Sequence, residues 1–351
     1  MSETRPAHVH ILGAGLIGAS IGLGLSADGW YCTIDDRDPD IARLAQALGA
    51  GGQLDQEEPT IVVVAAPPAV TPQVVQESLT RWPSAVVTDV ASVKVPIAEA
   101  ARLVDPARYV GSHPMAGREI SGATAAQGDL FKARPWVVCA EGATMSAVAE
   151  VRRIAEALQA DVVEMAAGAH DVAVARVSHV PQVAASAVAA ALGPLHADDV
   201  ALAGQGLRDV TRIAASAPGM WADIARMNRA SIHTTLDHII GDLEDVREAD
   251  DIGEALTDLI ERGRLEVERI PGKHGGPTRD WVPITVIVPD EPGQLLRLLS
   301  DAESARVNVE DITIEHSPRQ PVGLTTLHVL PERANELRLT LEANGWEIAS
   351  S

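Results

Sequence analysis

A glycine-rich turn lies near the start of the sequence, between a short apolar run and a segment with helical spacing. Residues 8–12 precede Gly13-Ala14-Gly15-Leu16-Ile17-Gly18, and residues 19–27 continue the helical pattern. In such a turn the first glycine permits a tight bend, the second lets the backbone approach a pyrophosphate, and the third allows close packing of helix on strand. The helix N-terminus adds N–H donors and a positive dipole. We therefore expect a dinucleotide to bind at Gly13, Gly15, Leu16, Ile17 and Gly18.

Acidic residues at the end of the next β-branched run fit the same site. Asp35 and Asp36 follow the first glycine at roughly the 20-residue spacing at which a carboxylate accepts hydrogen bonds from a ribose diol. A carboxylate at this place repels a 2′-phosphate, which favours NAD over NADP as the cofactor. Arg37 weakens that preference, because a guanidinium can bind the phosphate instead.

Two polar motifs follow other strand-like runs. Residues 89–94 have the sequence Asp-Val-Ala-Ser-Val-Lys and include Ser92, and residues 111–119 have the sequence Gly-Ser-His-Pro-Met-Ala-Gly-Arg-Glu and include His113. In a parallel sheet both motifs project from the carboxyl ends of strands, where cofactors bind. A lone histidine after a strand is more often a satisfied polar residue than a catalytic one, so this placement alone does not assign its role.

Seven strand-length runs, with helical segments between most of them, must position these residues. The runs span residues 8–12, 31–35, 60–65, 85–90, 109–112, 136–140 and 161–165. Such alternation is typical of a parallel, doubly wound α/β sheet of the Rossmann type. We assign residues 1–167 to a nucleotide-binding domain.

The predicted secondary structure changes twice in the remainder of the chain. Residues 168–270 are predicted to be all helical, with breaks at 193–194 and 217–219. Residues 271–280 are predicted to be a linker because prolines and glycines dominate them; a basic phosphate loop is the alternative. Residues 281–351 predict a small α+β domain of βαββα type. Its strands are expected at 284–288, 309–315 and 325–330, and its helices at 294–305 and 332–344.

Composition excludes several classes of protein. The 351 residues carry a net charge of −21, which repels nucleic-acid phosphates and anionic lipids, so we expect neither nucleic acid nor a membrane as partner. Only Cys32 and Cys139 are present, each in an apolar run, which excludes a disulfide scaffold or a cysteine-based zinc site; we expect no metal. Residues 1–7 lack signal-peptide features, and the apolar run 183–192 is far shorter than a span of about 20 residues. We expect a cytoplasmic protein.

The ordered motifs resemble those of the prephenate and arogenate dehydrogenases of tyrosine biosynthesis. The matching segments, over about residues 8–250, are the glycine turn, residues 89–94, residues 112–117, His170-Asp171 with residues 178–181, and residues 208–212. The resemblance implies an NAD-binding domain, a helical dimerisation domain, a homodimer, and an active site between the two domains. In the family reaction hydride leaves C4 of a cyclohexadienol for NAD, CO2 leaves C1, and the ring becomes aromatic.

The resemblance also implies roles for single residues. His113 is expected to accept the hydroxyl proton, which suits a neutral imidazole with an ordinary pKa of about 6.5. Ser92 is expected to hydrogen-bond that histidine near the nicotinamide, and Arg212 to hold a substrate carboxylate through its guanidinium fork. Asp36 is favoured over Asp35 as the ribose ligand by its place relative to the following proline. The other residues expected to line the substrate pocket are Arg208, Glu119, His179 and Gln182.

Gln182 departs from the family pattern, which often has a second histidine there, close to the substrate's side chain. A neutral amide can donate to the keto group of prephenate or accept from the ammonium of arogenate. We take prephenate as the substrate, because Gln182 supplies no negative charge to attract an ammonium, and keep arogenate as the alternative.

The C-terminal residues 281–351 resemble an ACT domain, the small ligand-sensing module of amino-acid metabolism. The effector, which we expect to be tyrosine, would bind at Gly293, Asn308 and Val309. Glycine lets backbone N–H groups approach a carboxylate, and Asn308 can offer an amide to the polar end of an amino acid. An inert dimerisation module is the alternative.

Two other functional classes fit part of the pattern. A hydroxyacid or imino-acid reductase on a similar two-domain frame would not require Ser92, His113 and Arg212 together. A non-enzymatic NAD-sensing regulatory protein would use its third domain as an interaction module, and the intact His113 argues against it.

Overall fold

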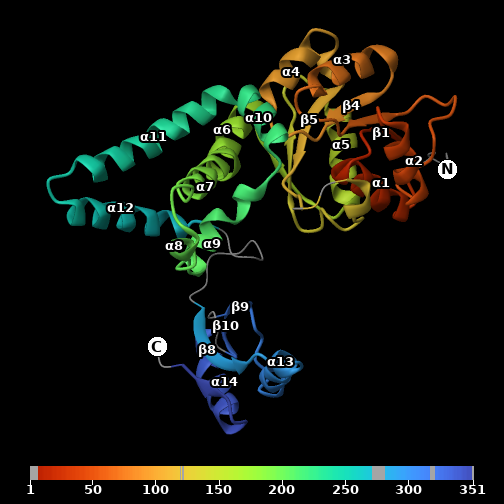
Figure 1. The fold of residues 1–351 in the computed structure, drawn as a ribbon. Helices are drawn as coiled ribbons and strands as arrows, with labels where there is room; N and C mark the ends of the chain where they lie inside the picture. Colours follow the sequence, from red (N-terminus) through yellow and green to blue (C-terminus); the bar gives the residue numbers. More distant parts are fainter. Residues whose placement is uncertain (1–6, 119, 121, 271–280, 317–320, 350–351) are drawn as a thin grey trace. The chain divides into compact units, whose positions relative to one another are not determined.

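The N-terminal part of the protein is built on a seven-stranded sheet (Figure 1). The computed structural model describes residues 7–118, 120, 122–270, 281–316 and 321–349. The chain divides into two compact units, Met1–Gly241 and Asp242–Ser351. The predicted linker, residues 271–280, lies outside the described residues.

The strand order of the sheet is β2-β1-β3-β4-β5-β6-β7. Its strands coincide with the seven predicted runs: β1 (His8–Leu12), β2 (Tyr31–Asp35), β3 (Ile61–Val64), β4 (Val86–Asp89), β5 (Tyr109–Pro114), β6 (Pro135–Cys139) and β7 (Asp161–Glu164). Strand β1 lies between β2 and β3, so the chain reverses its direction of travel across the sheet there. Ligands of doubly wound sheets bind in the crevice beyond the carboxyl ends of strands at such a switch point.

Helices connect most of these strands. They are α1 (Leu16–Ala27), α2 (Pro39–Ala47), α3 (Thr71–Arg81), α4 (Val95–Arg102) and α5 (Met145–Ala157), with short turns η1 (Pro106–Arg108) and η2 (Ala123–Ala125). The β1 and β3 strands are almost entirely buried, with Val9, Ile11 and Val63 at the centre of the core. Strands buried on both faces read as continuous apolar runs, which is why they could be located from the sequence.

The predicted parallel, doubly wound sheet is confirmed, but it contains one antiparallel pair of strands. Strands β5 and β6 are antiparallel, with His113 opposite Val137, whereas the other paired strands of this sheet are parallel. Among the described residues of the connection between them, the only helical element is the three-residue turn η2, whereas a parallel pair would need a crossover helix. His113, near the end of β5, therefore lies beside the first residues of β6, which starts at the edge of the sheet where β5 ends.

The segment predicted to be helical is helical. It contains α6 (Ala167–Val174), a π-helical turn η3 (Ala175–His179), α7 (Val180–Ala190), α8 (Ala197–Val200), α9 (Gln205–Thr211), η4 (Arg212–Ala215), α10 (Pro218–Met227), α11 (Arg229–Glu248) and α12 (Ile252–Val267). The breaks fall where they were expected, between α7 and α8 and directly before α10. The π turn carries His179, and such turns occur often at functional sites.

One helical run, Ala167–Ala190, has the length and mean hydropathy, 24 residues and 1.2, of a membrane span. Core helices of globular proteins pass the same test. This run also carries His170 and Asp171, both buried and hydrogen-bonded, so it is weak evidence for a membrane.

The C-terminal unit contains a four-stranded antiparallel sheet of order β11-β8-β10-β9. Its elements are β8 (Val282–Pro289), α13 (Gln294–Ser304), β9 (Asp311–His316), β10 (Val322–Val329), α14 (Pro331–Ala343) and β11 (Glu347–Ile348). Alternate residues of β8 and β10, including Ile284, Val286 and Leu327, pack with Leu298 and Leu341 of the helices. The predicted βαββα order is confirmed, and β11 is an added strand that was not predicted.

Candidate active site

The glycine turn between β1 and α1 leaves no room for side chains at two of its three glycines. Gly13 has a φ of +109°, and a Cβ there would lie 2.3 Å from the carbonyl oxygen of Ala65; a Cβ on Gly18 would lie 1.9 Å from the oxygen of Gly13. At Gly15, in contrast, a Cβ would meet no atom within 4 Å. The turn is therefore packed on its inner side and open at its middle glycine, which is where a pyrophosphate would approach the backbone.

Asp36 is joined to this turn. Its Oδ2 accepts a hydrogen bond from the Ala14 backbone N–H at 2.8 Å, and its Oδ1 accepts from the Asp38 N–H at 2.9 Å. The Asp35 carboxylate is exposed and accepts from the N–H of Asp36. Of the two acids, Asp36 is the one whose carboxylate is attached to the glycine turn.

His113 lies on β5 and is partly exposed. Its Nδ1 is 2.9 Å from Nε2 of His170, and Nδ1 of His170 is 2.8 Å from Oδ1 of Asp171. Both His170 and Asp171 belong to α6 and are buried. Burial, followed by electrostatic interactions with His170 and Lys94, holds the pKa of His113 well below 6.5, so the ring is neutral at physiological pH.

Ser92 does not form the hydrogen bond to His113 that the family resemblance implies. Its Oγ is buried and has no hydrogen-bond partner among the described residues. The predicted hydrogen bond is therefore absent from this structure, in which Nδ1 of His113 contacts Nε2 of His170. A buried hydroxyl without a partner carries a desolvation cost, which a bound group with a donor or acceptor would remove.

A buried ion pair holds the loop that bears Ser92 against β5. Lys94 pairs with Asp89, and its Nζ also donates to the Ser112 carbonyl at 2.7 Å. The Tyr109 hydroxyl donates to Asp89 Oδ1 at 2.7 Å. Burial, with the nearby Asp89 carboxylate, raises the pKa of Tyr109 well above 10.0, so the phenol stays protonated as a donor.

His179 is buried on the helical side of the site. Its Nδ1 lies 3.2 Å from the amide nitrogen of Asn228, which also donates to the Asp171 carbonyl at 2.7 Å. Burial lowers the pKa of His179 to about 4, so the ring is neutral. Its Nε2 and the indole nitrogen of Trp221, whose ring is 6.1 Å away, are both buried without hydrogen-bond partners in the described part of the chain.

Gln182 is buried, and its amide is engaged by the protein. Its Nε2 donates to the Ile213 carbonyl at 3.0 Å and to Ser186 at 3.3 Å, and its Oε1 accepts from Ser216 at 3.3 Å. The donors that were expected to reach a substrate keto group are thus directed at Ile213 in the turn η4 and at Ser186 on α7. That turn begins with Arg212.

Among the described residues, no hydrogen bond joins the remaining predicted pocket residues to His113. Arg212 and Arg208 are both exposed, the first on η4 and the second on α9. Glu119 lies outside the described residues.

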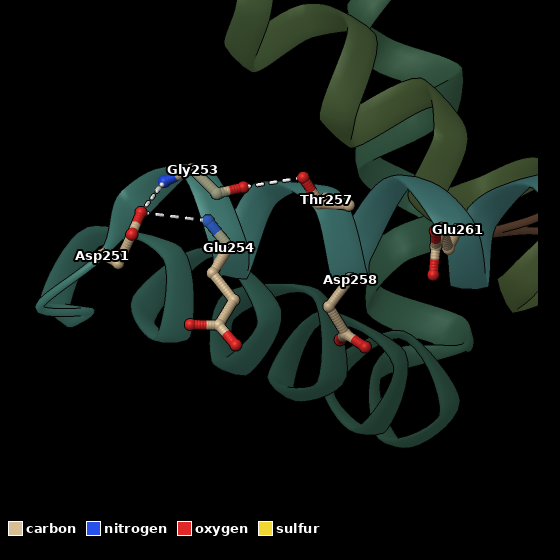
Figure 2. Close-up of a pocket in the computed structure, with 6 residues that line it drawn as sticks. All are labelled: Asp251, Gly253, Glu254, Thr257, Asp258 and Glu261. Atoms are coloured by element: carbon tan, nitrogen blue, oxygen red, sulfur yellow. Dashed lines mark hydrogen bonds between the residues drawn. The ribbon is translucent and has the colours of Figure 1, made fainter.

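A surface hollow on α12 does not suit an anionic ligand. Figure 2 shows its lining, which comes from this one helix: Asp251, Gly253, Glu254, Thr257, Asp258 and Glu261. The Asp251 carboxylate accepts from the N–H groups of Gly253 and Glu254, which is ordinary helix capping. Among the residues that the structure covers, no group of three or more histidine, cysteine or acidic side chains could hold a metal ion.

Two family models match consecutive parts of the chain. Residues 21–164 match the prephenate dehydrogenase nucleotide-binding domain, and residues 166–258 match the prephenate dehydrogenase dimerization domain. The chain belongs to the prephenate dehydrogenase family. The two matches meet within a few residues of the predicted boundary at 167–168, and they end before the small C-terminal sheet.

Individual members of the prephenate dehydrogenase family extend the likeness over nearly the whole chain. "Probable prephenate dehydrogenase NovF" of Streptomyces niveus is 33% identical over 96% of this chain and 98% of its own length. The prephenate dehydrogenase of Bacillus subtilis is 28% identical over 87% of each chain. Among solved structures, the A. aeolicus prephenate dehydrogenase in complex with hydroxyphenyl propionate and NAD+ has a TM-score of 0.66 and 25% identity, covering 76% of this chain and all of that one. Synechocystis arogenate dehydrogenase has a TM-score of 0.65 and 25% identity, covering 75% and 99%.

Several residues that surround His113 were not predicted as site residues. His170, Asp171 and Lys94 stood in recognised motifs, but their types and spacing carried no sign that they would reach His113 and its loop. Asn228 had no local signal at all. Its amide joins α6 to His179 through contacts between residues 57 and 49 positions apart.

Proposed function

We propose that this protein is an NAD-dependent prephenate dehydrogenase, which oxidises and decarboxylates prephenate to 4-hydroxyphenylpyruvate in tyrosine biosynthesis. The family membership supports the reaction class. The open backbone at Gly15, the carboxylate of Asp36 on the glycine turn, and the unpartnered Ser92 hydroxyl are the features that fit a dinucleotide. Bound NAD would supply the acceptor for the hydride that leaves C4 of the ring.

His113 is the group to which we assign the proton. The C4 hydroxyl must lose its proton as the carbonyl forms, and a neutral imidazole can accept it. When the carboxylate at C1 leaves as CO2, its electron pair flows through the ring to the C4 oxygen, and the protonated His113 can return the proton to that oxygen. Ser92 would stand beside the cofactor, and Arg212 would hold a substrate carboxylate through its guanidinium.

The observation that carries this proposal is the state of His113. The ring is held through Nδ1, is neutral, and forms no hydrogen bond through Nε2 within the described part of the chain. Nδ1 therefore binds the protein, and Nε2 is left to accept a proton from a substrate. His113→Asn should lower turnover by roughly 10²- to 10⁴-fold with little change in NAD affinity.

The test is the formation of NADH, followed by absorbance, with prephenate and with arogenate and with NAD and NADP. NADH from prephenate supports the proposal. No NADH from either substrate would show that the chain is not a catalyst of this class and would favour the NAD-sensing alternative.

Arogenate is the second candidate substrate. The engagement of both Gln182 amide hydrogens by Ile213 and Ser186 favours it, because the oxygen retains a lone pair that could accept from an ammonium. The relatives with the highest identity to this chain among those compared above are named prephenate dehydrogenases, so we keep prephenate as the main proposed substrate. A higher kcat/KM for arogenate would reverse the order.

We further propose a separate function for each domain. Residues 1–167 bind NAD, and residues 168–270 bind substrate and form a homodimer. Residues 271–280 are a linker, and residues 281–351 are regulatory. Exposed apolar side chains on the helices support the homodimer. They include Val172, Val177, Val188, Ile240 and Leu256. A cytoplasmic location is part of the same proposal.

For the C-terminal unit we propose an ACT-like module that binds an amino-acid effector, with tyrosine as the expected ligand. Gly293 precedes α13 with a φ of +90° and open space where a Cβ would stand. Asn308 is exposed and Val309 half-buried in the segment before β9. These positions offer backbone N–H groups and an amide to a zwitterionic ligand.

A further inference from the structure

We propose that His170 is a positioning residue that fixes the tautomer of His113, with Asp171 as the anchor. The proposal rests on the proposed function in one respect, that His113 is the proton acceptor. The three side chains form a continuous chain of hydrogen bonds: His113 Nδ1 to His170 Nε2 at 2.9 Å, and His170 Nδ1 to Asp171 Oδ1 at 2.8 Å.

The Asp171 carboxylate sets the direction of the chain. It accepts from the backbone N–H groups of Lys94 at 2.7 Å and Val95 at 2.9 Å, where α4 begins. An ionised carboxylate only accepts, so the proton between Asp171 and His170 belongs to Nδ1 of His170.

The tautomer of His113 follows from that of His170. When Nδ1 of His170 carries the only ring proton, Nε2 of His170 is an acceptor, and Nδ1 of His113 then donates to it. His113 then carries its proton on Nδ1 and has an unprotonated Nε2.

This is the tautomer that a base at C4 requires. The O–H bond of the substrate breaks, its electron pair forms the C4 carbonyl as hydride passes to NAD, and the proton bonds to Nε2 of His113. The Nδ1–H of His113 donates to His170 both before and after this transfer, so no hydrogen bond of the chain has to rearrange. Without an acceptor at position 170 the ring could place its proton on Nε2, and that form cannot accept a proton from the substrate.

Packing alone does not account for an imidazole at position 170. The side chain is 1% exposed, and both of its ring nitrogens are used. Asp171 is 5% exposed and its backbone carbonyl is held by Asn228, so the anchor is fixed from two sides. A continuous chain of this kind, from a helix N-terminus to one catalytic nitrogen, orients the ring as well as its proton.

The experiment measures which ring nitrogen of His113 carries the proton. The full-length enzyme is labelled with ¹⁵N-histidine, with and without NAD, and the His113 signals are assigned by their loss in His113→Asn. We expect Nδ1 to be protonated. His170→Phe, which keeps a ring but removes the acceptor, should shift the proton to Nε2 and lower kcat by at least about tenfold.

Two further variants separate positioning from folding. His170→Gln retains an acceptor oxygen that does not titrate, so it should keep the Nδ1 tautomer and most of the rate. His10→Phe is the matched control: His10 is also buried and hydrogen-bonded, at 3.0 Å to Thr33, and its loss should change neither the tautomer nor kcat.

An Nε2 proton on His113 in the unmodified enzyme would overturn the proposal, because His170 would then be the donor. Unchanged kcat and tautomer in His170→Phe would overturn it as well. If His170→Phe does not fold, the wild-type spectrum and the rate of His170→Gln decide. If the unmodified enzyme makes no NADH from prephenate or arogenate, the proposed function fails, and the tautomer spectrum still decides the role of His170.

Discussion

Lys94 and Asp89 form an ion pair in which neither side chain has any exposed surface. The pair ties the turn after β4 to β5, since the Lys94 ammonium also donates to the Ser112 carbonyl. Ser92 lies two residues before Lys94, and His113 directly follows Ser112. We place Ser92 beside the cofactor and assign the substrate proton to His113, so the buried ion pair helps to position both residues.

Lys94→Met should destabilise the protein strongly. It leaves the Asp89 carboxylate buried with an uncompensated charge, which typically costs about 3–5 kcal/mol in the free energy of unfolding. Urea denaturation of the full chain measures it. Arg43→Met, which removes the exposed ion pair with Asp40 on α2, is the control and should change stability by less than about 1 kcal/mol. Equal losses in both variants would contradict the argument.

The pH dependence of catalysis should reflect the lowered pKa of His113, which is partly buried. Its pKa lies well below 6.5, first because of burial and then because of His170, Lys94 and His179. The neutral ring is the active form, so activity is retained as the pH falls through 6.5 and is lost only at lower pH, where the ring becomes protonated. A pH profile of kcat/KM for the acidic limb checks this. An inflection at or above 6.5 would mean that His113 is not held as the structure indicates.

Arg212→Ala should raise KM for prephenate more than it lowers kcat. A carboxylate bound equally in the ground and transition states contributes uniform binding. The loss of a charge-assisted hydrogen bond, about 1.5–3 kcal/mol, corresponds to roughly a 10- to 100-fold rise. Arg226→Ala, on α10 and paired with Asp223, is the control. A change in kcat alone would show that Arg212 is not a simple anchor.

Asp36→Asn should reduce the preference for NAD over NADP. The amide keeps the size of the side chain and an oxygen for one of the two backbone N–H groups from which Asp36 accepts, those of Ala14 and Asp38, and it removes the charge that repels a 2′-phosphate. We expect the ratio of kcat/KM values to fall at least about tenfold, the effect of one charge-assisted hydrogen bond. Asp35→Asn should change it less. Equal efficiency of the unmodified enzyme with both cofactors would defeat the charge argument.

Asn308→Ala should weaken inhibition by tyrosine without changing turnover. Inhibition requires that tyrosine bind the less active state better, and a tenfold rise in the half-inhibitory concentration corresponds to about 1.4 kcal/mol of differential affinity. Glu303→Ala, at an exposed position on α13, is the control. Unaltered inhibition in Asn308→Ala would point to tyrosine acting as a product analogue in the active site. Inhibition by another amino acid would retain the mechanism and change the ligand.

Local patterns in the sequence determined the positions of the strands and helices and the identity of the glycine turn. Buried β-branched runs and helical spacing are properties of consecutive residues, so β1 to β7 and the helical segment could be located without a structure. The same holds for the crowding at Gly13 and Gly18, because their neighbours in space are set by the β1-α1 turn and the adjacent strand.

The tertiary structure alone decided how His113 is held. The direction of β6 depends on the path of the loop that precedes it. The sequence of that loop has no periodic pattern, so its path could not be predicted. The contact of His113 with His170 joins residues 57 positions apart, and that of Lys94 with Asp171 joins residues 77 apart. Such pairings exist only when α6 packs against the end of the sheet, because a hydrogen bond depends on a position to within a few tenths of an ångström, which no residue type encodes. For that reason the family resemblance implied Ser92 as the partner of His113, whereas the folded chain supplies His170.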